Sequence, residues 1–491
     1  MNWSGTGTPR VRISTVDGAA QSWIRADGDG LARRTVGGAL DDRGLPHLFR
    51  YRPFEFSASG DGVTVHPPHP LAPGQWYRVE VDGLDQDWTF RTRAPLPRPQ
   101  HTLRVATDGS APFCTVQGAI DAAAGETGPV IIEVAAGSYR EICHLGDCLP
   151  PLIIRGAGRG RTVISYDNNN LLNGQPSHSR CRHRRLGDRD LYNGWRANIG
   201  VDAADIRFED LSMINSTPLG GSQAEAFRGN HERLVLDRVE VHSFQDTMRL
   251  QGRVFLSHSL ISGTVDFVWG AGAVYHWRNE YRSRASTPQR EADGSFVLQV
   301  RNAAHERGHV LRQCRFTRES GVGDGSVRIA RTDARAFPHS EVVLIDCEVD
   351  RHIDRSAFLI TPEPVGSVRF AATGTIDEHG HPVEFSTGPG IRRATATEID
   401  HDRDPAKVLD GWVPYTVNVP EVPVAAGEEF TVDWSAPPGH SAAASIDVAG
   451  RRIPVETDAT LGTVSIRAPH QPGEHRITFG DATATVEVLR S

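Results

Sequence analysis

The middle of the chain repeats one pattern of apolar and polar positions. Two apolar residues with one residue between them are followed, after two further residues, by a second such pair. The copies are Ile206, Phe208, Leu211 and Met213; Leu234, Leu236, Val239 and Val241; Val254, Leu256, Ser259 and Ile261; His309, Leu311, Cys314 and Phe316; and Val342, Leu344, Cys347 and Val349. Ser259 and His309 are imperfect members of the repeat.

The alternation inside each copy indicates short strands with one buried face. Unequal intervals between copies are expected when the coils of one solenoid carry loops of different length. A β-sandwich would also contain short strands, but it would not repeat their internal pattern. The sequence therefore predicts an all-β fold with a parallel β-helix at its centre. Ahead of it, Val116, Ile120 and Ala123 at helical spacing, between an N-cap at Thr115 and a stop at Gly125, predict a helix that caps the stack.

Both ends of the chain have a different pattern. Trp76–Val81 alternates apolar and polar residues, and the proline-rich stretch Ala94–Gln100 indicates a linker. Alternating strands return after Tyr415. We predict two small β-sandwiches resembling Ig-like accessory domains. The predicted domains are residues 1–98, the β-helix at 101–413, and residues 415–491.

Three tryptophans in these outer domains leave two interpretations open. Trp76, Trp88 and Trp434 could stack on sugars, or they could fill the cores of the sandwiches.

Composition excludes several classes of function. The 491 residues are 38% hydrophobic and 23% charged, as in a globular protein. The net charge of −8 argues against a nucleic-acid partner. Lys407 is the only lysine, which argues against mechanisms that need a phosphate-binding or Schiff-base lysine. No stretch approaches membrane length, so we expect no membrane partner.

The six cysteines do not indicate a metal site. No C-x-x-C pair occurs, so neither a structural zinc nor any other metal is expected. Cys143 and Cys148 could form a disulfide or remain free thiols. Cys314 and Cys347 occupy the same position of two copies of the repeat, which indicates stacked interior thiols.

Two aspartates each follow a copy of the repeat by the same number of residues. Asp246 lies five positions after Val241, and Asp266 lies five positions after Ile261. Because parallel strands stack about 4.8 Å apart, the two carboxyl groups should be neighbours on one face. Two such close carboxylates resist ionising together, so one should keep its proton at neutral pH. A carboxylate beside a carboxylic acid suits hydrolysis.

Gln223 and Arg331 show a second coincidence. Each lies eleven residues before a strand of the repeat, at Leu234 and Val342. The sequence predicts that they share another position of the coil. A glutamine amide can donate to an oxyanion, and an arginine can hold an aspartate ionised. Structural roles for both residues remain an open alternative.

Four segments carry a resemblance to a known family. They are V-A-T-D-G-S-A-P-F-C-T-V-Q-G-A-I-D-A-A, G-S-Q-A-E-A-F-R, Q-D-T and G-T-V-D-F-V-W-G. Together they resemble pectin methylesterases (carbohydrate esterase family eight) over about residues 102–414. The resemblance implies a right-handed parallel β-helix, no cofactor, and pectin or oligogalacturonide as the substrate.

The resemblance also implies roles for five residues. Asp266 would attack the methyl-ester carbonyl of a galacturonate unit. Asp246 would protonate the leaving methanol and then activate the hydrolytic water. Gln223 and Gln245 would stabilise the tetrahedral oxyanion, and Arg331 would hydrogen-bond the nucleophile.

The chain departs from the family around these residues. Asp333, in I-A-R-T-D, stands where the family has a tryptophan that stacks on the substrate, and Trp269 replaces a phenylalanine. The stretch Ser177–Arg196 is an arginine-rich insertion that includes Arg185. We predict substrate contacts for Phe267, Trp269, Asp333 and Arg185. The insertion could equally be a solvated basic loop.

Alternatives remain for substrate, activity and compartment. The chain could hydrolyse another uronide ester or an acetylated sugar, or bind pectin without catalysis. A serine hydrolase is disfavoured because no G-x-S-x-G occurs, and neither a pectate lyase nor a polygalacturonase pattern is found. The N-terminus has no apolar signal core. We expect a monomer that is secreted or periplasmic, with a cytoplasmic location left open.

Overall fold

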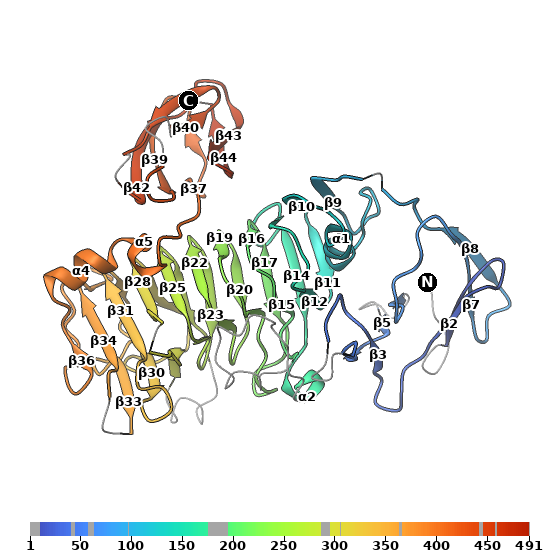
Figure 1. The fold of residues 1–491 in the computed structure, drawn as a ribbon, viewed down its shortest axis with the longest axis horizontal. Coiled ribbons are helices and arrows are strands. Elements are labelled where there is room, and N and C mark those ends of the chain that lie inside the picture. The colour runs from blue at the N-terminus through green and yellow to red at the C-terminus, as the bar shows by residue number, and fades with distance from the viewer. Residues whose placement is uncertain are drawn as a thin grey trace.

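The middle of the chain winds into coils, each of which gives one strand to each of three parallel sheets (Figure 1). The computed structural model describes residues 10–40, 45–56, 63–96, 98–174, 195–285, 295–304, 306–362, 366–440, 445–456 and 459–490. We name the three sheets the first, second and third sheet, in the order in which each coil meets them.

The strands of each sheet follow one another along the chain. The first sheet contains β9 (Thr102–Val105), β10 (Val130–Val134), β13 (Leu152–Arg155), β16 (Ile206–Glu209), β19 (Leu234–Asp237), β22 (Arg253–Ser257), β25 (Ala273–Trp277), β28 (His309–Arg312), β31 (Glu341–Ile345), β34 (Arg369–Thr373) and β36 (Ile391–Arg392). The second contains β11 (Gly137–Arg140), β14 (Thr162–Tyr166), β17 (Ser212–Asn215), β20 (Glu240–His242), β23 (Leu260–Gly263), β26 (Glu280–Ser283), β29 (Arg315–Arg318), β32 (Glu348–Val349) and β35 (Ile376–Asp377). The third contains β12 (Cys143–Leu145), β15 (Ile199–Val201), β18 (Phe227–Gly229), β21 (Met248–Leu250), β24 (Val268–Gly270), β27 (Ser295–Val300), β30 (Val327–Asp333) and β33 (Phe358–Thr361).

The predicted parallel β-helix is confirmed, and the repeat sets its register. Ile206 pairs with Leu234, and Leu234 pairs with Val254. The repeated apolar positions face the interior and form one continuous buried cluster. Sequence reasoning missed one coil, formed by β25 and β26, whose Val274 continues the row between Val254 and His309. Cys314 and Cys347 are buried free thiols in that interior, as predicted.

The turns between strands repeat as regularly as the strands. After the first-sheet strands, Arg238, His258 and Arg278 adopt φ values of 53°, 48° and 53°. One left-handed residue is enough to turn the chain sharply from one sheet into the next. Asp246 and Asp266 are the equivalent residues of another turn, with φ values of 62° and 50°. Their left-handed backbone is therefore part of the coil geometry.

A helix covers the N-terminal end of the stack. α1 (Val116–Ala123) begins at the N-cap Thr115, whose side chain accepts a hydrogen bond from the backbone N–H of Gly118. Val116, Ile120 and Ala123 are buried against the first coils, as their spacing predicts. The other helices among the described residues are α2 (Asn170–Asn173), α4 (Ala396–Asp402) and α5 (Pro405–Val408). No helix in the described part of the chain is long and apolar enough to cross a membrane.

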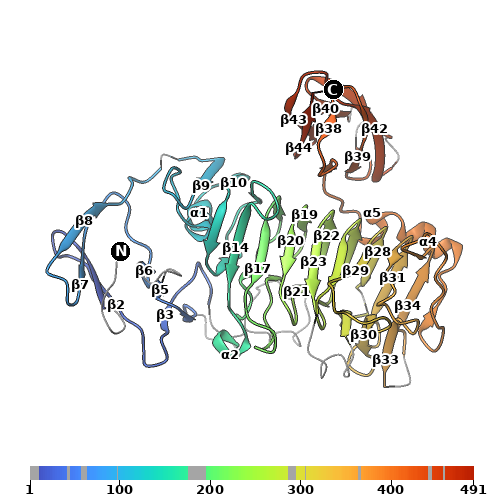
Figure 2. The same cartoon turned by 180° about the vertical axis from the view of Figure 1, so that it is seen from behind.

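Small sheets lie outside the β-helix: the N-terminal ones beyond its first coils, and the C-terminal ones beside its coils (Figure 2). The N-terminal strands are β1 (Val11–Thr15), β2 (Gln21–Ile24), β3 (Ala32–Arg34), β4 (Phe49–Tyr51), β5 (Phe54–Phe56), β6 (Val63–Val65), β7 (Trp76–Val81) and β8 (Asp87–Arg91). The C-terminal strands are β37 (Thr416–Asn418), β38 (Val424–Ala425), β39 (Glu429–Ser435), β40 (Ser445–Val448), β41 (Arg451–Pro454), β42 (Leu461–Arg467), β43 (Gly473–Phe479) and β44 (Ala482–Leu489). The exact domain boundaries and the Ig-like classification stay predictions.

The tryptophans of these flanking sheets divide between the two interpretations. Trp434 is 2% exposed and lies in the core between the two C-terminal sheets. Trp76 and Trp88 are 52% and 39% exposed, so neither fills a core.

Polar contacts attach the C-terminal sheets to the side of the β-helix. Arg238 donates to the backbone oxygen of Val417 at 2.9 Å, and His258 lies 2.9 Å from a carboxylate oxygen of Asp433. Both residues are left-handed turn residues that follow first-sheet strands. The attachment therefore lies on a turn that does not carry the two predicted catalytic aspartates.

Candidate active site

Asp246 and Asp266 occupy the same position of adjoining coils. Each lies two residues before a third-sheet strand, and Met248 pairs with Val268 in those strands. The residues before the aspartates, Gln245 and Val265, form a parallel bridge. The backbone N–H of Asp246 donates to the oxygen of Val265 at 3.1 Å. The predicted adjacency of the two aspartates is therefore confirmed, at one strand spacing of about 4.8 Å.

Asp266 is buried and held by an arginine from two coils further along. Its relative exposure is 5%. Arg331, in β30, donates from Nε to Oδ1 at 2.8 Å and from Nη2 to Oδ2. The guanidinium also lies 5.0 Å from the ring centre of Phe296. This two-pronged contact fixes both oxygens and stabilises a negative charge on them.

Asp246 has a different electrostatic environment. Burial raises its pKa to about 8, and the negative charges of Glu225 and Asp266 add to the effect. The positive charges of Arg196 and Arg301 oppose it. Asp246 therefore holds its proton at neutral pH, which is the division of roles expected for two neighbouring carboxyl groups.

Sequence reasoning missed Arg196 and Glu225. Arg196 donates to Oδ2 of Asp246 at 2.8 Å and to both carboxylate oxygens of Glu225 at 2.9 and 2.7 Å. Glu225 is 1% exposed. The sequence held a signal for it, because Glu225 stands between Ala224 and Ala226 in a segment that also carries a predicted site residue. A glutamate in such an apolar context is rarely buried without a partner.

The two glutamines lie on the segments that lead into the site. Gln223 precedes β18, and its Oε1 accepts a hydrogen bond from the hydroxyl of Ser222 at 3.1 Å. Gln245 comes directly before Asp246, and its backbone oxygen accepts from the N–H of Ala224 at 3.1 Å. The glutamines therefore lie on adjoining coils, and their role as oxyanion donors stays a prediction.

The predicted equivalence of Gln223 and Arg331 is wrong. Third-sheet pairing aligns Arg331 with Gln299, Gln299 with Trp269, and Trp269 with Arg249. Gln223 lies ahead of β18, outside this row. The equal count of eleven residues arose because the connection after β30 is longer than the connection after β18. Arg331 nevertheless reaches Asp266 through its long side chain.

The structure corrects the predicted substrate contact of Phe267. Its side chain is 0% exposed and belongs to the interior cluster of the β-helix, so Phe267 is a core residue. Phe267 lies in the turn that precedes β24, and its side chain packs into the interior together with that of Val268.

Trp269 faces away from the core but is covered by arginines. The guanidinium carbons of Arg301, Arg249 and Arg196 lie 4.6, 5.1 and 5.7 Å from its ring centre. Trp269 is 1% exposed, so it offers no open stacking face in this structure. The predicted sugar contact would require these arginines to move.

The last two predicted substrate contacts are Asp333, which the structure describes, and Arg185, which it does not. Asp333 is exposed at the end of β30, on the same face of the strand as Arg331. One of its carboxylate oxygens accepts hydrogen bonds from the backbone N–H groups of Arg335 and Ala336, at 3.0 and 3.1 Å. Asp333 thus caps the following turn. Arg185 lies outside the described residues.

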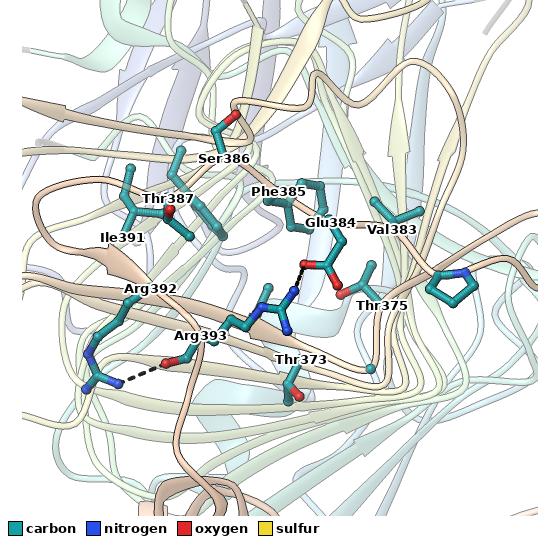
Figure 3. Close-up of a pocket in the computed structure, with 14 residues that line it drawn as sticks. Thr373, Thr375, Val383, Glu384, Phe385, Ser386, Thr387, Ile391, Arg392 and Arg393 are labelled. Carbon is teal, nitrogen blue, oxygen red and sulfur yellow. Dashed lines mark hydrogen bonds and ion pairs between the residues drawn. The ribbon is translucent and has the colours of Figure 1, made fainter.

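A separate cavity of about 150 Å³ lies at the C-terminal end of the β-helix (Figure 3). Phe385, Thr375 and Ile391 line it, and an exposed ion pair joins Glu384 to Arg393 at its mouth. None of the predicted site residues lines this cavity. In the described part of the chain, no group of three or more histidine, cysteine, aspartate or glutamate side chains is arranged to hold a metal ion.

Comparisons with known proteins point to one family. The family model described as pectinesterase matches residues 102–362. "Probable pectinesterase 56" of Arabidopsis thaliana is 32% identical over 264 residues, covering 52% of this chain and 84% of the relative. A pectinesterase of Ralstonia solanacearum is 31% identical over 189 residues, covering 35% of this chain and 48% of the relative.

Solved structures show the same fold. A pectin methylesterase from carrot superposes with a TM-score of 0.53 at 20% identity, covering 63% of this chain and 93% of that chain. A pectin methylesterase from Erwinia chrysanthemi gives 0.50 at 18% identity, covering 65% and 99%. The similar stretch is the β-helix that carries the two aspartates.

Proposed function

The chain belongs to the pectinesterase family, and we propose that it hydrolyses the methyl esters of galacturonate units in pectin through Asp266 and Asp246. It is a carboxylic ester hydrolase. The observation that carries the assignment of roles is the asymmetry of the two aspartates. Asp266 is paired with Arg331 as a carboxylate, whereas Asp246 keeps a proton at neutral pH.

In the first step, a carboxylate oxygen of Asp266 attacks the ester carbonyl carbon. The carbonyl oxygen becomes an oxyanion, which the amide groups of Gln223 and Gln245 would stabilise. As the oxyanion re-forms the carbonyl, the bond to the methoxy oxygen breaks. Asp246 gives its proton to that oxygen, methanol leaves, and the substrate stays bound to Asp266 as an acid anhydride.

In the second step, the roles of Asp246 reverse. Its carboxylate now accepts a proton from a water molecule that attacks the anhydride. The bond to Asp266 breaks, and the galacturonate product leaves with a free carboxyl group. Asp266 is again a carboxylate and Asp246 is again protonated, so the cycle closes with one water consumed and one methanol released.

The proposed substrate has consequences for location and partners. Pectin is a polymer outside the cells that make or degrade it, so we propose a secreted or periplasmic protein that acts as a monomer. Arg301, which lies over Trp269 and is partly exposed, suits a polymer that carries free carboxylates between its methyl esters.

Methanol release from methyl-esterified pectin tests the proposal. The wild type should release methanol, and Asp266→Ala should not. Asp346→Ala is a matched control. Asp346 is also a left-handed turn aspartate, with φ of 53°, and it pairs with Arg403 at 2.9 Å on the first-sheet side. An active Asp266→Ala variant would overturn the assignment.

A second candidate keeps the chemistry and changes the sugar. The arginine-covered Trp269 and the turn-capping Asp333 replace residues that the family resemblance assigns to substrate contacts. A panel of methylated and acetylated uronides, tested as polymers and as short oligosaccharides, distinguishes the candidates. Higher kcat/KM for an acetylated sugar than for methyl-esterified galacturonan would favour the second. Binding without turnover of any ester would favour a non-catalytic pectin-binding protein.

A further inference from the structure

Arg196 bridges the protonated aspartate to a third buried carboxylate. Its Nη2 lies 2.8 Å from Oδ2 of Asp246, while its Nε lies 2.9 and 2.7 Å from the two oxygens of Glu225. The guanidinium carbon lies 5.7 Å from the ring centre of Trp269. Arg196 is 7% exposed and Glu225 is 1% exposed. The bridge is therefore enclosed inside the protein.

Neighbouring coils hold Glu225 in place through its backbone. The backbone oxygen of Glu225 accepts hydrogen bonds from the N–H of Asn198 at 3.0 Å and from Nδ2 of Asn215 at 2.9 Å. Glu225 itself stands between Ala224 and Ala226 in the segment that leads into β18. These contacts fix the backbone from which the Glu225 side chain extends to Arg196.

The contact between Arg196 and Asp246 poses a problem for catalysis. An arginine hydrogen-bonded to a carboxyl group favours its ionised form, which cannot protonate methanol. The other charged groups that act on Asp246 include Glu225 and Asp266, which are negative, and Arg301 and Arg331, which are positive. Glu225 engages Arg196 through two of the three contacts that the guanidinium makes with carboxylates. Its charge therefore offsets the effect of Arg196 on Asp246.

We propose that Glu225 and Arg196 are positioning residues for Asp246: Glu225 keeps the proton on Asp246 in the resting site, and Arg196 stabilises the carboxylate that forms when that proton leaves. This inference rests on the proposed function. The proton moves from Asp246 to the methoxy oxygen as the C–O bond breaks. The negative charge left on Asp246 then meets Nη2 of Arg196, already at hydrogen-bonding distance. When water attacks, its proton returns to Asp246 and the bridge is restored.

Glu225→Gln is the decisive variant, because it removes the charge and keeps the shape and a hydrogen-bond acceptor for Arg196. Asp246 should then ionise more readily. The alkaline limb of kcat/KM against pH should move about one to two units to lower pH, with activity recovering in mild acid. An unchanged limb, or a limb moved to higher pH, would overturn the proposal. Infrared titration of the Asp246 carboxylic acid band gives the same shift without substrate.

Arg196 is tested by replacement with lysine and with methionine. Lysine keeps the charge but lacks the planar fork that reaches two carboxylates, so kcat should fall about tenfold with KM nearly unchanged. Methionine should lower kcat further, and lysine should rescue part of that loss. Equal kcat for both variants and the wild type would contradict the role of Arg196.

A matched control separates this role from a general loss of stability. Glu341→Gln breaks an equivalent two-pronged pair, in which Arg369 contacts the Glu341 carboxylate at 3.1 and 2.8 Å on the first sheet. It should lower the melting temperature and leave the pH profile unchanged. If the wild type releases no methanol, the proposed function fails. A wild type that is active and shares its pH profile with Glu225→Gln would refute only the inference.

Discussion

On the first sheet, three carboxylates form ion pairs with a group of arginines that attaches the C-terminal sheets, whereas beside the third sheet three carboxylates form ion pairs with arginines in the candidate active site. The first cluster consists of Glu209, Asp210 and Asp237 with Arg155, Arg207 and Arg238. The second consists of Glu225, Asp246 and Asp266 with Arg196 and Arg331. Arg301, which is partly exposed, also faces Asp246 in the second cluster.

The pKa values of Asp237 in the first cluster and Asp246 in the second are shifted in opposite directions. Burial raises the pKa of Asp237, but Arg238 and Arg207 outweigh it and the net pKa is lowered. At Asp246 burial dominates, Glu225 and Asp266 add to it, and the pKa is raised to about 8. The same residue types thus build an attachment surface in one place and a proton donor in the other. The charges that act on each buried carboxyl group determine which of the two results.

The largest expected effect comes from removing the proton donor. Asp246→Asn keeps the shape of the side chain but cannot transfer a proton to methanol. We expect kcat for methanol release to fall by about 10²–10⁴-fold, with KM changed much less. Steady-state kinetics on methyl-esterified galacturonan would measure this. A loss of less than tenfold would mean that another group protonates the leaving methanol.

Removing Arg238 from the first cluster should lower the stability of the fold and leave the rate of ester hydrolysis unchanged. Arg238 donates to Asp210, Asp237 and the backbone oxygen of Val417. Arg238→Met removes the guanidinium that contacts all three carboxylates and leaves the buried ones with less compensating charge, so the free energy of unfolding should fall by about 3–5 kcal/mol. Denaturant unfolding would measure the loss. A shifted pH profile of kcat/KM in this variant would contradict the separation of the two clusters.

Removing Arg331 from the second cluster should slow the reaction. In Arg331→Gln, the two-pronged contact that fixes both carboxylate oxygens of Asp266 is lost, so the nucleophile is no longer held in one orientation. We expect kcat for methanol release to fall by about 10–10²-fold. Steady-state kinetics on methyl-esterified galacturonan would measure the loss. An unchanged kcat would mean that Arg331 does not orient the nucleophile.

The last prediction is a stability cost of the proton donor itself. The folded state holds a proton on Asp246 that the unfolded chain releases near its ordinary pKa of 3.8. Between about pH 4 and pH 8 the folded state binds more protons, so stability falls as pH rises. Relative to Asp246→Asn, the wild type should lose unfolding free energy over that window. A constant difference between them would indicate an unshifted pKa.

Periodicity carried most of the fold prediction. The repeat around Leu234 and Val342 predicts the parallel strands because each apolar position must face one interior. It missed the coil of Val274 because His276, Asn279 and bulky Tyr281 disguise the repeat. Counting residues failed for Arg331, since the length of a connection is not fixed by the strands that it joins.

The sequence predicted the site residues whose positions follow from the backbone repeat. Asp246 and Asp266 follow from that repeat, because each is a turn residue of its coil. Arg196 could not be found this way. It reaches Asp246 from fifty residues away, and only the folded coils bring it beside Glu225. Long-range charge balance depends on burial and side-chain direction, which spacing does not show.

The protonation state of Asp246 is the central claim, and infrared difference spectroscopy tests it directly. Spectra of the wild type minus Asp246→Asn, recorded from pH 4 to pH 10, isolate the carboxyl band of this residue. We predict a protonated carboxylic acid at pH 7 that titrates near pH 8. A carboxylate band at pH 7, with titration below about pH 5, would contradict the account.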